Sequence, residues 1–232
     1  MRLDKYISNS GYATRSEVKK LLKSGIVTVN GEISKKADLH IDEHCDTVKI
    51  NGTEISYNKY VYLMLNKPKG FISATEDKKY RVVTELVDER YRHYNVFPVG
   101  RLDIDTEGLL ILSNDGGFAH NLTSPKKNVY KKYFAVLDKD AEDKDIEEFE
   151  KGMEFDDFKA KSAILTITDK KNEVYIEIAE GKFHQVKRMC KRVGKEVLYL
   201  KRVSIGGLEL DENLPLGRIR ELTKDELESI FA

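Results

Sequence analysis

The hydrophobic pattern of the first sixty residues predicts a helix followed by small hairpins. The helix begins at Thr14–Glu17, a capping box in which the Thr and Glu side chains satisfy free backbone amides. Gly25 can end this helix, and residues 26–29 then have the apolar, β-branched composition of a strand. The dipeptides Asn30-Gly31 and Asn51-Gly52 supply the positive φ angles of tight hairpin turns. This part of the chain therefore forms a structural unit of its own.

The remaining residues alternate predicted strands with a few short helices. The strands are expected at residues 60–65, 109–112, up to Leu137, 164–167, 174–178, 197–203 and 208–210. The helices are expected at residues 118–122, ending near Ser124-Pro125, at 143–153, at 186–193 and after a second capping box, Thr223–Glu226. Residues 82–87 fit either a helix or a strand. The pattern predicts an α+β protein.

Composition adds a contrast between two segments, although the net charge of the 232-residue chain is zero. Residues 138–157 hold eleven acids against three lysines, and residues 182–202 hold eight lysines or arginines against one glutamate. Within 186–193 the basic side chains occupy one helical face and apolar side chains the other. We therefore expect an acidic side and a basic side, the latter suited to phosphates.

Several classes of protein are excluded or disfavoured by simple counts. The two cysteines, Cys45 and Cys190, provide neither a disulfide framework nor enough ligands for a structural zinc site. The first residues lack the apolar core of a signal peptide, and no apolar run reaches the length of a membrane span. We expect a cytoplasmic, monomeric protein without membrane contact.

A cluster of polar residues precedes the apolar run Leu109–Leu112. Arg101, Asp103, Asp105, Thr106 and Glu107 make up this cluster. Charged side chains beside a buried strand are either solvated or functional. The carboxylates superficially resemble a calcium loop, but its twelfth position is Asn114 where a bidentate Glu is required. A hydrolase would need a second matched carboxylate, and no nucleotide-binding or zinc motif is present, so we predict no cofactor and no metal.

The stretch Gly100-Arg101-Leu102-Asp103-x-x-Thr106-x-Gly108-Leu109-Leu110 resembles the signature of the bacterial rRNA pseudouridine synthases of the RsuA type. Three further stretches resemble motifs of that family. They are Asn66–Gly70 (Asn-Lys-Pro-x-Gly), Lys131–Tyr133 (Lys-x-Tyr) and Glu180–Met189 (Glu-Gly-x-x-His-Gln-Val-Lys-Arg-Met). Residues 14–31 are similar to the S4 RNA-binding domain.

The resemblance implies an S4-like RNA-binding domain at residues 1–59 and a synthase domain at residues 60–232 with a mixed, mainly antiparallel sheet. It implies isomerisation of one rRNA uridine to pseudouridine, most directly in 16S rRNA at a site of the uridine 516 type. The partner is then the small-subunit rRNA or an assembly intermediate of that subunit. The alternatives are a large-subunit rRNA synthase of the same family and a non-enzymatic S4-type assembly factor.

The resemblance also assigns roles to residues. Asp103 is the expected catalytic residue, as a nucleophile or as a base on the ribose. Tyr133 is expected against the target base, and either Lys187 or Arg188 is expected to pair with Asp103. Arg101 is a candidate to occupy the space that the extruded uridine leaves. Further RNA contacts are expected from Arg15, Lys19, Lys20, Lys67, Lys131, His184, Gln185, Lys191 and Arg192.

Overall fold

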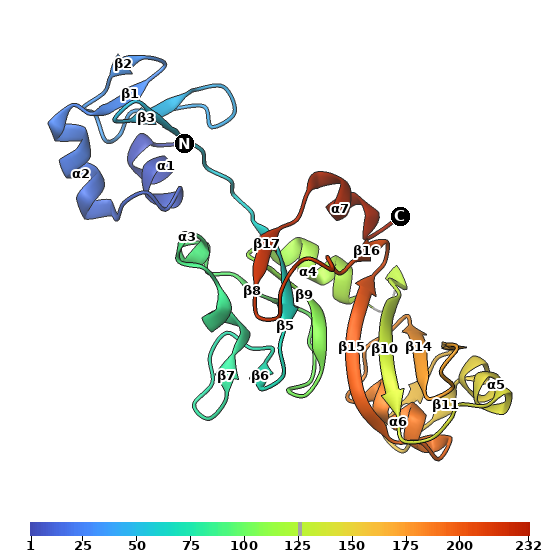
Figure 1. Ribbon diagram of the computed structural model, residues 1–232. Coiled ribbons are helices and arrows are strands. Elements are labelled where there is room, and N and C mark those ends of the chain that lie inside the picture. The colour runs from blue at the N-terminus through green and yellow to red at the C-terminus, as the bar shows by residue number, and fades with distance from the viewer. Residues whose placement is uncertain (125–126) are drawn as a thin grey trace. The chain divides into compact units, whose positions relative to one another are not determined.

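The computed structural model describes residues 1–124 and 127–232, which form two compact units of an α+β protein (Figure 1). The first unit comprises Met1–Val61 together with Asp88–Val96, and the second comprises Tyr62–Val87 and Phe97–Ala232. The sequence predicts a boundary after residue 59 and assigns residues 88–96 to the second domain, whereas the structure places that short segment in the first unit. No helix in the described part of the chain is long and apolar enough to cross a membrane.

The first unit packs helices against a four-stranded antiparallel sheet with the strand order β2-β1-β3-β4. Its helices are α1 (Leu3–Asn9), α2 (Arg15–Ser24) and α3 (Glu89–Arg92). Its strands are β1 (Val27–Val29), β2 (Glu32–Ile33), β3 (Val48–Ile50) and β4 (Thr53–Ile55). Apolar side chains from α1, α2 and the sheet, including Leu3, Val18 and Ile50, form its core.

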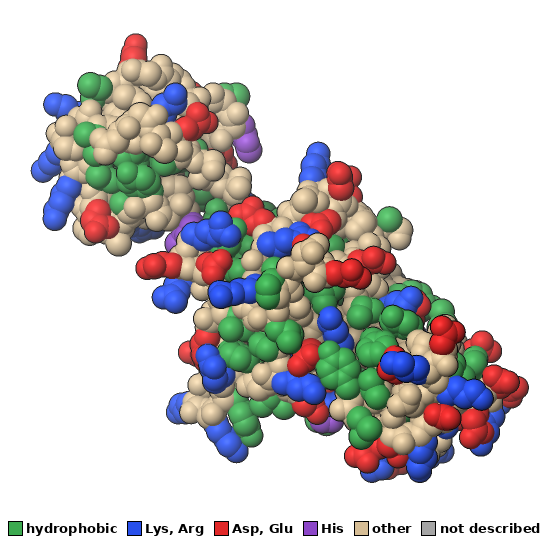
Figure 2. Space-filling view, in the orientation of Figure 1, with side chains coloured by type: hydrophobic (Ala, Val, Ile, Leu, Met, Phe, Trp, Pro, Cys, Tyr) green, Lys and Arg blue, Asp and Glu red, His purple; other side chains and the backbone are tan. Residues whose placement is uncertain are grey.

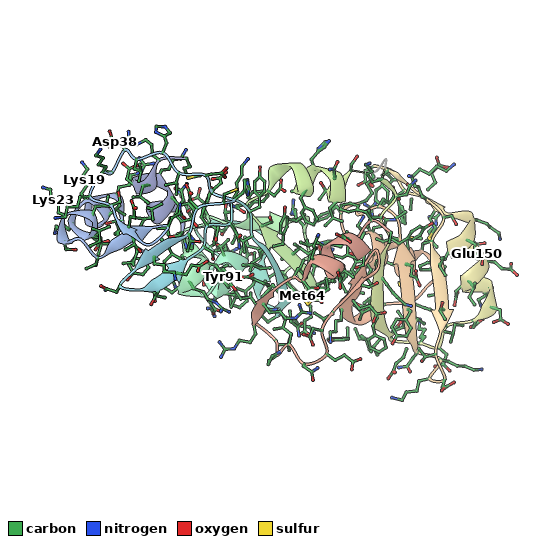
Figure 3. The ribbon with its side chains drawn as sticks, turned by 90° about the horizontal axis from the view of Figure 1, so that it is seen from above. Lys19, Lys23, Asp38, Met64, Tyr91 and Glu150 are labelled. Atoms are coloured by element: carbon green, nitrogen blue, oxygen red, sulfur yellow. The ribbon has the colours of Figure 1, made fainter. Side chains whose placement is uncertain are left out.

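The local signals in this unit have the predicted geometry. The Glu17 carboxylate accepts hydrogen bonds from the Thr14 backbone N–H at 2.8 Å and from the Thr14 hydroxyl at 2.7 Å. Gly25 ends α2 with a φ of 76°, and Asn30 turns the first hairpin with a φ of 52°. The basic side chains of α2 extend into solvent, as Lys19 does in Figure 3, and blue side chains gather along this side of the unit in Figure 2.

The second unit is built on a nine-stranded sheet, the predicted mixed, mainly antiparallel sheet. Its central order is β13-β14-β10-β15-β9-β5-β17, with β16 beside β15 and β8 beside β9. The strands are β5 (Tyr62–Lys67), β8 (Phe97–Val99), β9 (Glu107–Ser113), β10 (Lys131–Leu137), β13 (Ile164–Ile167), β14 (Glu173–Ile178), β15 (Val197–Ile205), β16 (Leu208–Glu209) and β17 (Ile219–Glu221). β9 and β15 run parallel, and the other pairs in this sheet are antiparallel.

Short helices and two small strand pairs complete the second unit. The helices are α4 (Gly116–Thr123), α5 (Asp143–Lys151), α6 (Gln185–Arg192) and α7 (Lys224–Ser229). The small pairs are β6 (Phe71–Ile72) with β7 (Arg81–Val82), and β11 (Met153–Glu154) with β12 (Lys159–Ala160). Residues 82–87, which the sequence fits to either a helix or a strand, contain both. β7 ends at Val82, and a 3-10 helix, η1 (Val83–Leu86), follows. Pro125, predicted near the end of α4, lies outside the described residues.

The acidic and basic segments do not form opposite sides of the molecule. The Arg188 guanidinium donates to Asp157 at 2.9 Å, and the buried Lys195 ammonium lies 2.6 Å from the buried Asp145 carboxylate. These ion pairs join the two segments directly. The predicted acidic and basic sides are therefore not fully separate, because these two ion pairs join the segments where they pack together.

Candidate active site

Asp103 lies in the loop that joins β8 to β9, and both ends of this loop are anchored. Gly100 begins it with a φ of 81°, a conformation that favours glycine. Leu102 is buried, and β9 begins at Glu107 within the central sheet. The Asp103 side chain remains partly exposed between these fixed points. The loop therefore holds a carboxylate in one place at the surface of the unit.

The end of β5 and the turn after it hold this loop by its backbone carbonyls. The Lys67 ammonium donates to the carbonyl oxygens of Asp103 at 3.0 Å, Thr106 at 2.9 Å and Pro68 at 3.1 Å. The Gly70 N–H donates to the Ile104 carbonyl at 2.8 Å. We call Lys67 and Gly70 the loop clamp.

The structure places Lys67 inside the fold, with protein partners in place of the predicted RNA contact. Its side chain is 0% exposed, and its three donors are used within the protein. Burial lowers the pKa of Lys67 to about 8, opposed by the negative charges of Asp105 and Asp103. Lys67 thus supports the position of Asp103 from within the fold.

Replacement of Lys67 by Met is expected to lower stability by about 2–4 kcal/mol, because buried carbonyls lose their donor. Activity is expected to fall by about a hundredfold as the loop shifts. Thermal unfolding and an activity assay measure the two effects. Lys69→Met is the matched control, since Lys69 is exposed and two residues away. Equal losses in both variants would contradict the role of the loop clamp.

The N-terminal end of α6 brings the nitrogen atoms of two side chains to Asp103. The Lys187 ammonium lies 3.4 Å from Asp103 Oδ2 and 2.5 Å from Asp105 Oδ1. The His184 Nε2 lies 3.6 Å from Asp103 Oδ1. Burial alone would raise the pKa of Asp105, but the hydrogen bond and charge of Lys187 lower it below its usual value. The site is therefore a pair of carboxylates that share one lysine.

Arg188, the alternative partner of Asp103 in the sequence prediction, points elsewhere. Its guanidinium pairs with Asp157 and lies over the rings of Phe155 and Phe158, 4.7 and 4.6 Å from their centroids. Lys187 is one residue earlier on the helix, about 100° around its axis, and this rotation directs it to the loop. The geometry thus assigns the contact with Asp103 to Lys187.

A pocket opens beside Asp103 and has a mixed polar and apolar lining. Tyr133, on β10, lines it and is 7% exposed, whereas Tyr130 is 45% exposed and lines a different pocket. The lining comprises Arg101, Leu102, Asp103, Thr106, Tyr133, Ile178, Gly181, Lys182, His184, Gln185, Val186, Lys187 and Leu200. Ile178 and Leu200 were not predicted as site residues. The alternation of apolar residues along β14 indicates that Ile178 is buried on one face of the sheet. The sequence does not show that β14 and β15 pair with β10, and this pairing is what places Ile178 and Leu200 at the pocket.

The other predicted RNA contacts divide into exposed and buried residues. Arg101 is exposed at the pocket, and Lys191 and Arg192 are exposed on α6. Arg15, Lys19 and Lys20 are exposed on α2 of the first unit. Among the basic residues predicted around Tyr130 and Tyr133, Lys126 lies outside the described residues.

Two predicted contacts have internal partners instead. Gln185 is buried, and its amide donates to Glu180 at 3.1 Å and accepts from the Lys182 N–H at 3.0 Å. The Lys131 ammonium donates to the Val129 carbonyl at 2.6 Å, and burial lowers its pKa to about 8. Within residues 1–124 and 127–232, no group of three His, Cys, Asp or Glu side chains is arranged to hold a metal ion.

Comparison with known proteins identifies two family models along the chain. The model described as RNA pseudouridylate synthase matches residues 61–192, which include the Asp103 loop and α6. The model described as S4 domain matches residues 1–48. Both regions lie where the sequence motifs occur.

Relatives and a solved structure match over nearly the full length. An uncharacterized RNA pseudouridine synthase of Bacillus subtilis is 45% identical, covering 98% of this chain and 97% of its own. The ribosomal small subunit pseudouridine synthases A of Vibrio vulnificus and Escherichia coli K12 are 38% and 35% identical, covering 100% and 99% of this chain and 100% of their own. A crystal structure of a pseudouridylate synthase superposes with a TM-score of 0.70 at 34% identity, covering 99% of both chains.

Proposed function

Because the chain belongs to the RNA pseudouridine synthases and begins with an S4 domain, we propose that it converts one uridine of small-subunit rRNA, of the uridine 516 type, to pseudouridine. The full-length similarity to two enzymes named for the small ribosomal subunit supports this substrate. A ribosomal RNA substrate implies action in the cytoplasm.

The contact between Asp103 and Lys187 at the mouth of a pocket is the observation that carries the proposal. Pseudouridine formation breaks the bond between the base nitrogen N1 and the ribose C1′, turns the base and joins its C5 to C1′. The proton lost from C5 is balanced by the proton gained at N1. We assign to Asp103 the chemical step, as a nucleophile or as a base on the ribose, and to Lys187 the role of keeping it ionised and oriented.

Tyr133 and Arg101 would handle the extruded nucleotide. A uridine within folded RNA must leave its stack before a side chain can reach its ribose. Tyr133 offers a ring on the wall of the same pocket, against which the extruded base can pack. Arg101 is exposed two residues before Asp103, where it can occupy the vacated position in the RNA.

Lys187→Met is expected to lower the rate of pseudouridine formation by about a hundredfold, because Asp103 and Asp105 lose their shared cation. Arg188→Met, on the same helix, is expected to retain activity within a few-fold, since Arg188 pairs with Asp157. Single-turnover assays with excess enzyme measure both. A larger loss in the Arg188 variant would reverse the assignment of these neighbouring residues.

The basic face of α2 is proposed to bind the rRNA backbone. We expect weaker rRNA binding when Gln replaces four residues of this face, Arg15, Lys19, Lys20 and Lys23. The magnitude of the slope of log K against log salt concentration is expected to fall by about one for each lost phosphate contact. Filter binding at several salt concentrations measures both quantities. The control replaces Lys144 and Lys151 of α5 by Gln. These two lysines pair with Glu142 and Glu148. An unchanged slope in the α2 variant would exclude this face.

The substrate is tested by mapping pseudouridine in 16S and 23S rRNA from cells with and without the gene. Loss of one 16S pseudouridine, restored by the wild-type gene, is the expected result. Loss of a 23S pseudouridine would identify a large-subunit enzyme instead. Purified protein given free 16S rRNA or small-subunit assembly intermediates then distinguishes the two possible substrates.

A further inference from the structure

Phe183 is a large apolar side chain that the fold leaves in solvent. It is 67% exposed, more than any other of the exposed large hydrophobic residues among those the structure describes. Its ring stacks on the His184 imidazole, with centroids 3.8 Å apart and planes inclined by 18°. One face of the Phe183 ring is thus covered by the imidazole, and the other face is free to contact a ligand. We call the two rings the Phe183–His184 stack.

The backbone beneath the stack is held in an uncommon conformation. His184 has a φ of 51° and a ψ of 28°, in the left-handed region that non-glycine residues rarely adopt. The turn is fixed because Gln185 bonds Glu180 and the Lys182 N–H, and because the Arg188 N–H donates to the His184 carbonyl at 2.9 Å. Strain of this kind persists where the surroundings determine the conformation, and it is concentrated at functional sites.

The stack stands at the rim of the pocket. His184 lines the pocket, and its Nε2 lies 3.6 Å from Asp103 Oδ1. Lys182, which precedes Phe183 in the sequence, also lines the pocket. Phe183 itself is not part of the lining, so its ring lies outside the space that the target base would occupy. An exposed aromatic face in this place can meet the nucleotide next to the one in the pocket.

We propose that the Phe183–His184 stack binds, by ring stacking, the base of a nucleotide adjacent to the target uridine. Stacking on aromatic side chains holds bases of any identity, since every base has a π-face. The lysine beside the ring, Lys182, is exposed and suited to the adjoining phosphate. The stack acts as a binding contact for the RNA strand beside Asp103, and this inference rests on the proposed function.

A double-mutant cycle tests the proposal with an RNA fragment spanning the mapped target. Binding is measured by fluorescence anisotropy in an Asp103→Asn background, so that no turnover occurs. Phe183→Leu is expected to weaken binding by about tenfold, and Phe183→Tyr to retain it. An RNA with an abasic site at one adjacent nucleotide is expected to bind the Asp103→Asn protein about tenfold more weakly. The same abasic site is expected to cause no further loss of binding to the protein that also carries Phe183→Leu. Ile164→Ala, a 47% exposed residue on β13, is the control.

Kinetics with Asp103 intact separate a contact to the RNA from a purely structural role of Phe183. Phe183→Leu is expected to raise KM by about tenfold and to leave the rate at saturating RNA close to wild type. Additive losses at every abasic position, or wild-type binding by the Leu variant, would overturn the proposal. If the mapped target is a large-subunit uridine, the same cycle is run on its fragment, so failure of the substrate assignment leaves this test intact.

Discussion

Asp103→Asn is expected to fold as the wild type does, to bind rRNA with near-normal affinity and to form no detectable pseudouridine. The substitution keeps the size of the side chain and removes its charge and its nucleophilicity. The loop clamp holds the backbone of this loop through Lys67 and Gly70, so the geometry around residue 103 does not depend on the carboxylate. Mass spectrometry or carbodiimide mapping of rRNA after incubation with each purified variant measures the product.

Asp105→Asn is the matched control for Asp103→Asn. Its carboxylate contacts the same lysine, yet Asp105 is absent from the pocket lining that Asp103 shares with Tyr133. We expect the Asp105 variant to keep part of its activity. Substantial pseudouridine formed by Asp103→Asn would falsify the catalytic assignment and return the function of the Asp103 loop to an open question.

Gly108→Ala is expected to destabilise the second unit by roughly 3–5 kcal/mol. Gly108 has a φ of 100°, and an added Cβ would overlap the carbonyl oxygen of Arg202 on β15 and lie 2.8 Å from its backbone nitrogen. Backbone atoms cannot rotate away from such an overlap, so β9 and β15 would have to separate. These two strands pair at Gly108 and Arg202, immediately beyond the Asp103 loop. Denaturant unfolding measures the loss of stability, and the pseudouridine assay measures its consequence for the site.

Gly70→Ala separates the overlap from the backbone strain. Gly70 also has a positive φ, 85°, but an added Cβ there has no heavy atom within 4 Å. Its cost is expected to be about 1–2 kcal/mol, from strain alone. Similar losses in the two variants would show that the close approach of β9 to β15 is not what requires glycine at position 108.

Local signals in the sequence determined several elements of this protein. The capping box at Thr14 and Glu17 and the turns at Asn30 and Asn51 involve residues close together in the chain, so their geometry follows from neighbouring side chains. The apolar face of residues 186–193 likewise determined a helix with one buried side. The motif around Asp103, through its resemblance to a known family, indicated where the chemistry is located.

The tertiary structure alone decided which distant groups meet. Lys67 and Lys187 are both lysines in basic stretches, yet one is enclosed by carbonyls of the Asp103 loop and the other faces its carboxylate. Arg188, one position from Lys187, is taken up by Asp157 of the acidic segment. These contacts join residues 31 to 84 positions apart, and they depend on strand order, register and helix rotation. The sequence carries the residue types for such contacts, but only the packing of the sheet and α6 brings the partners within reach.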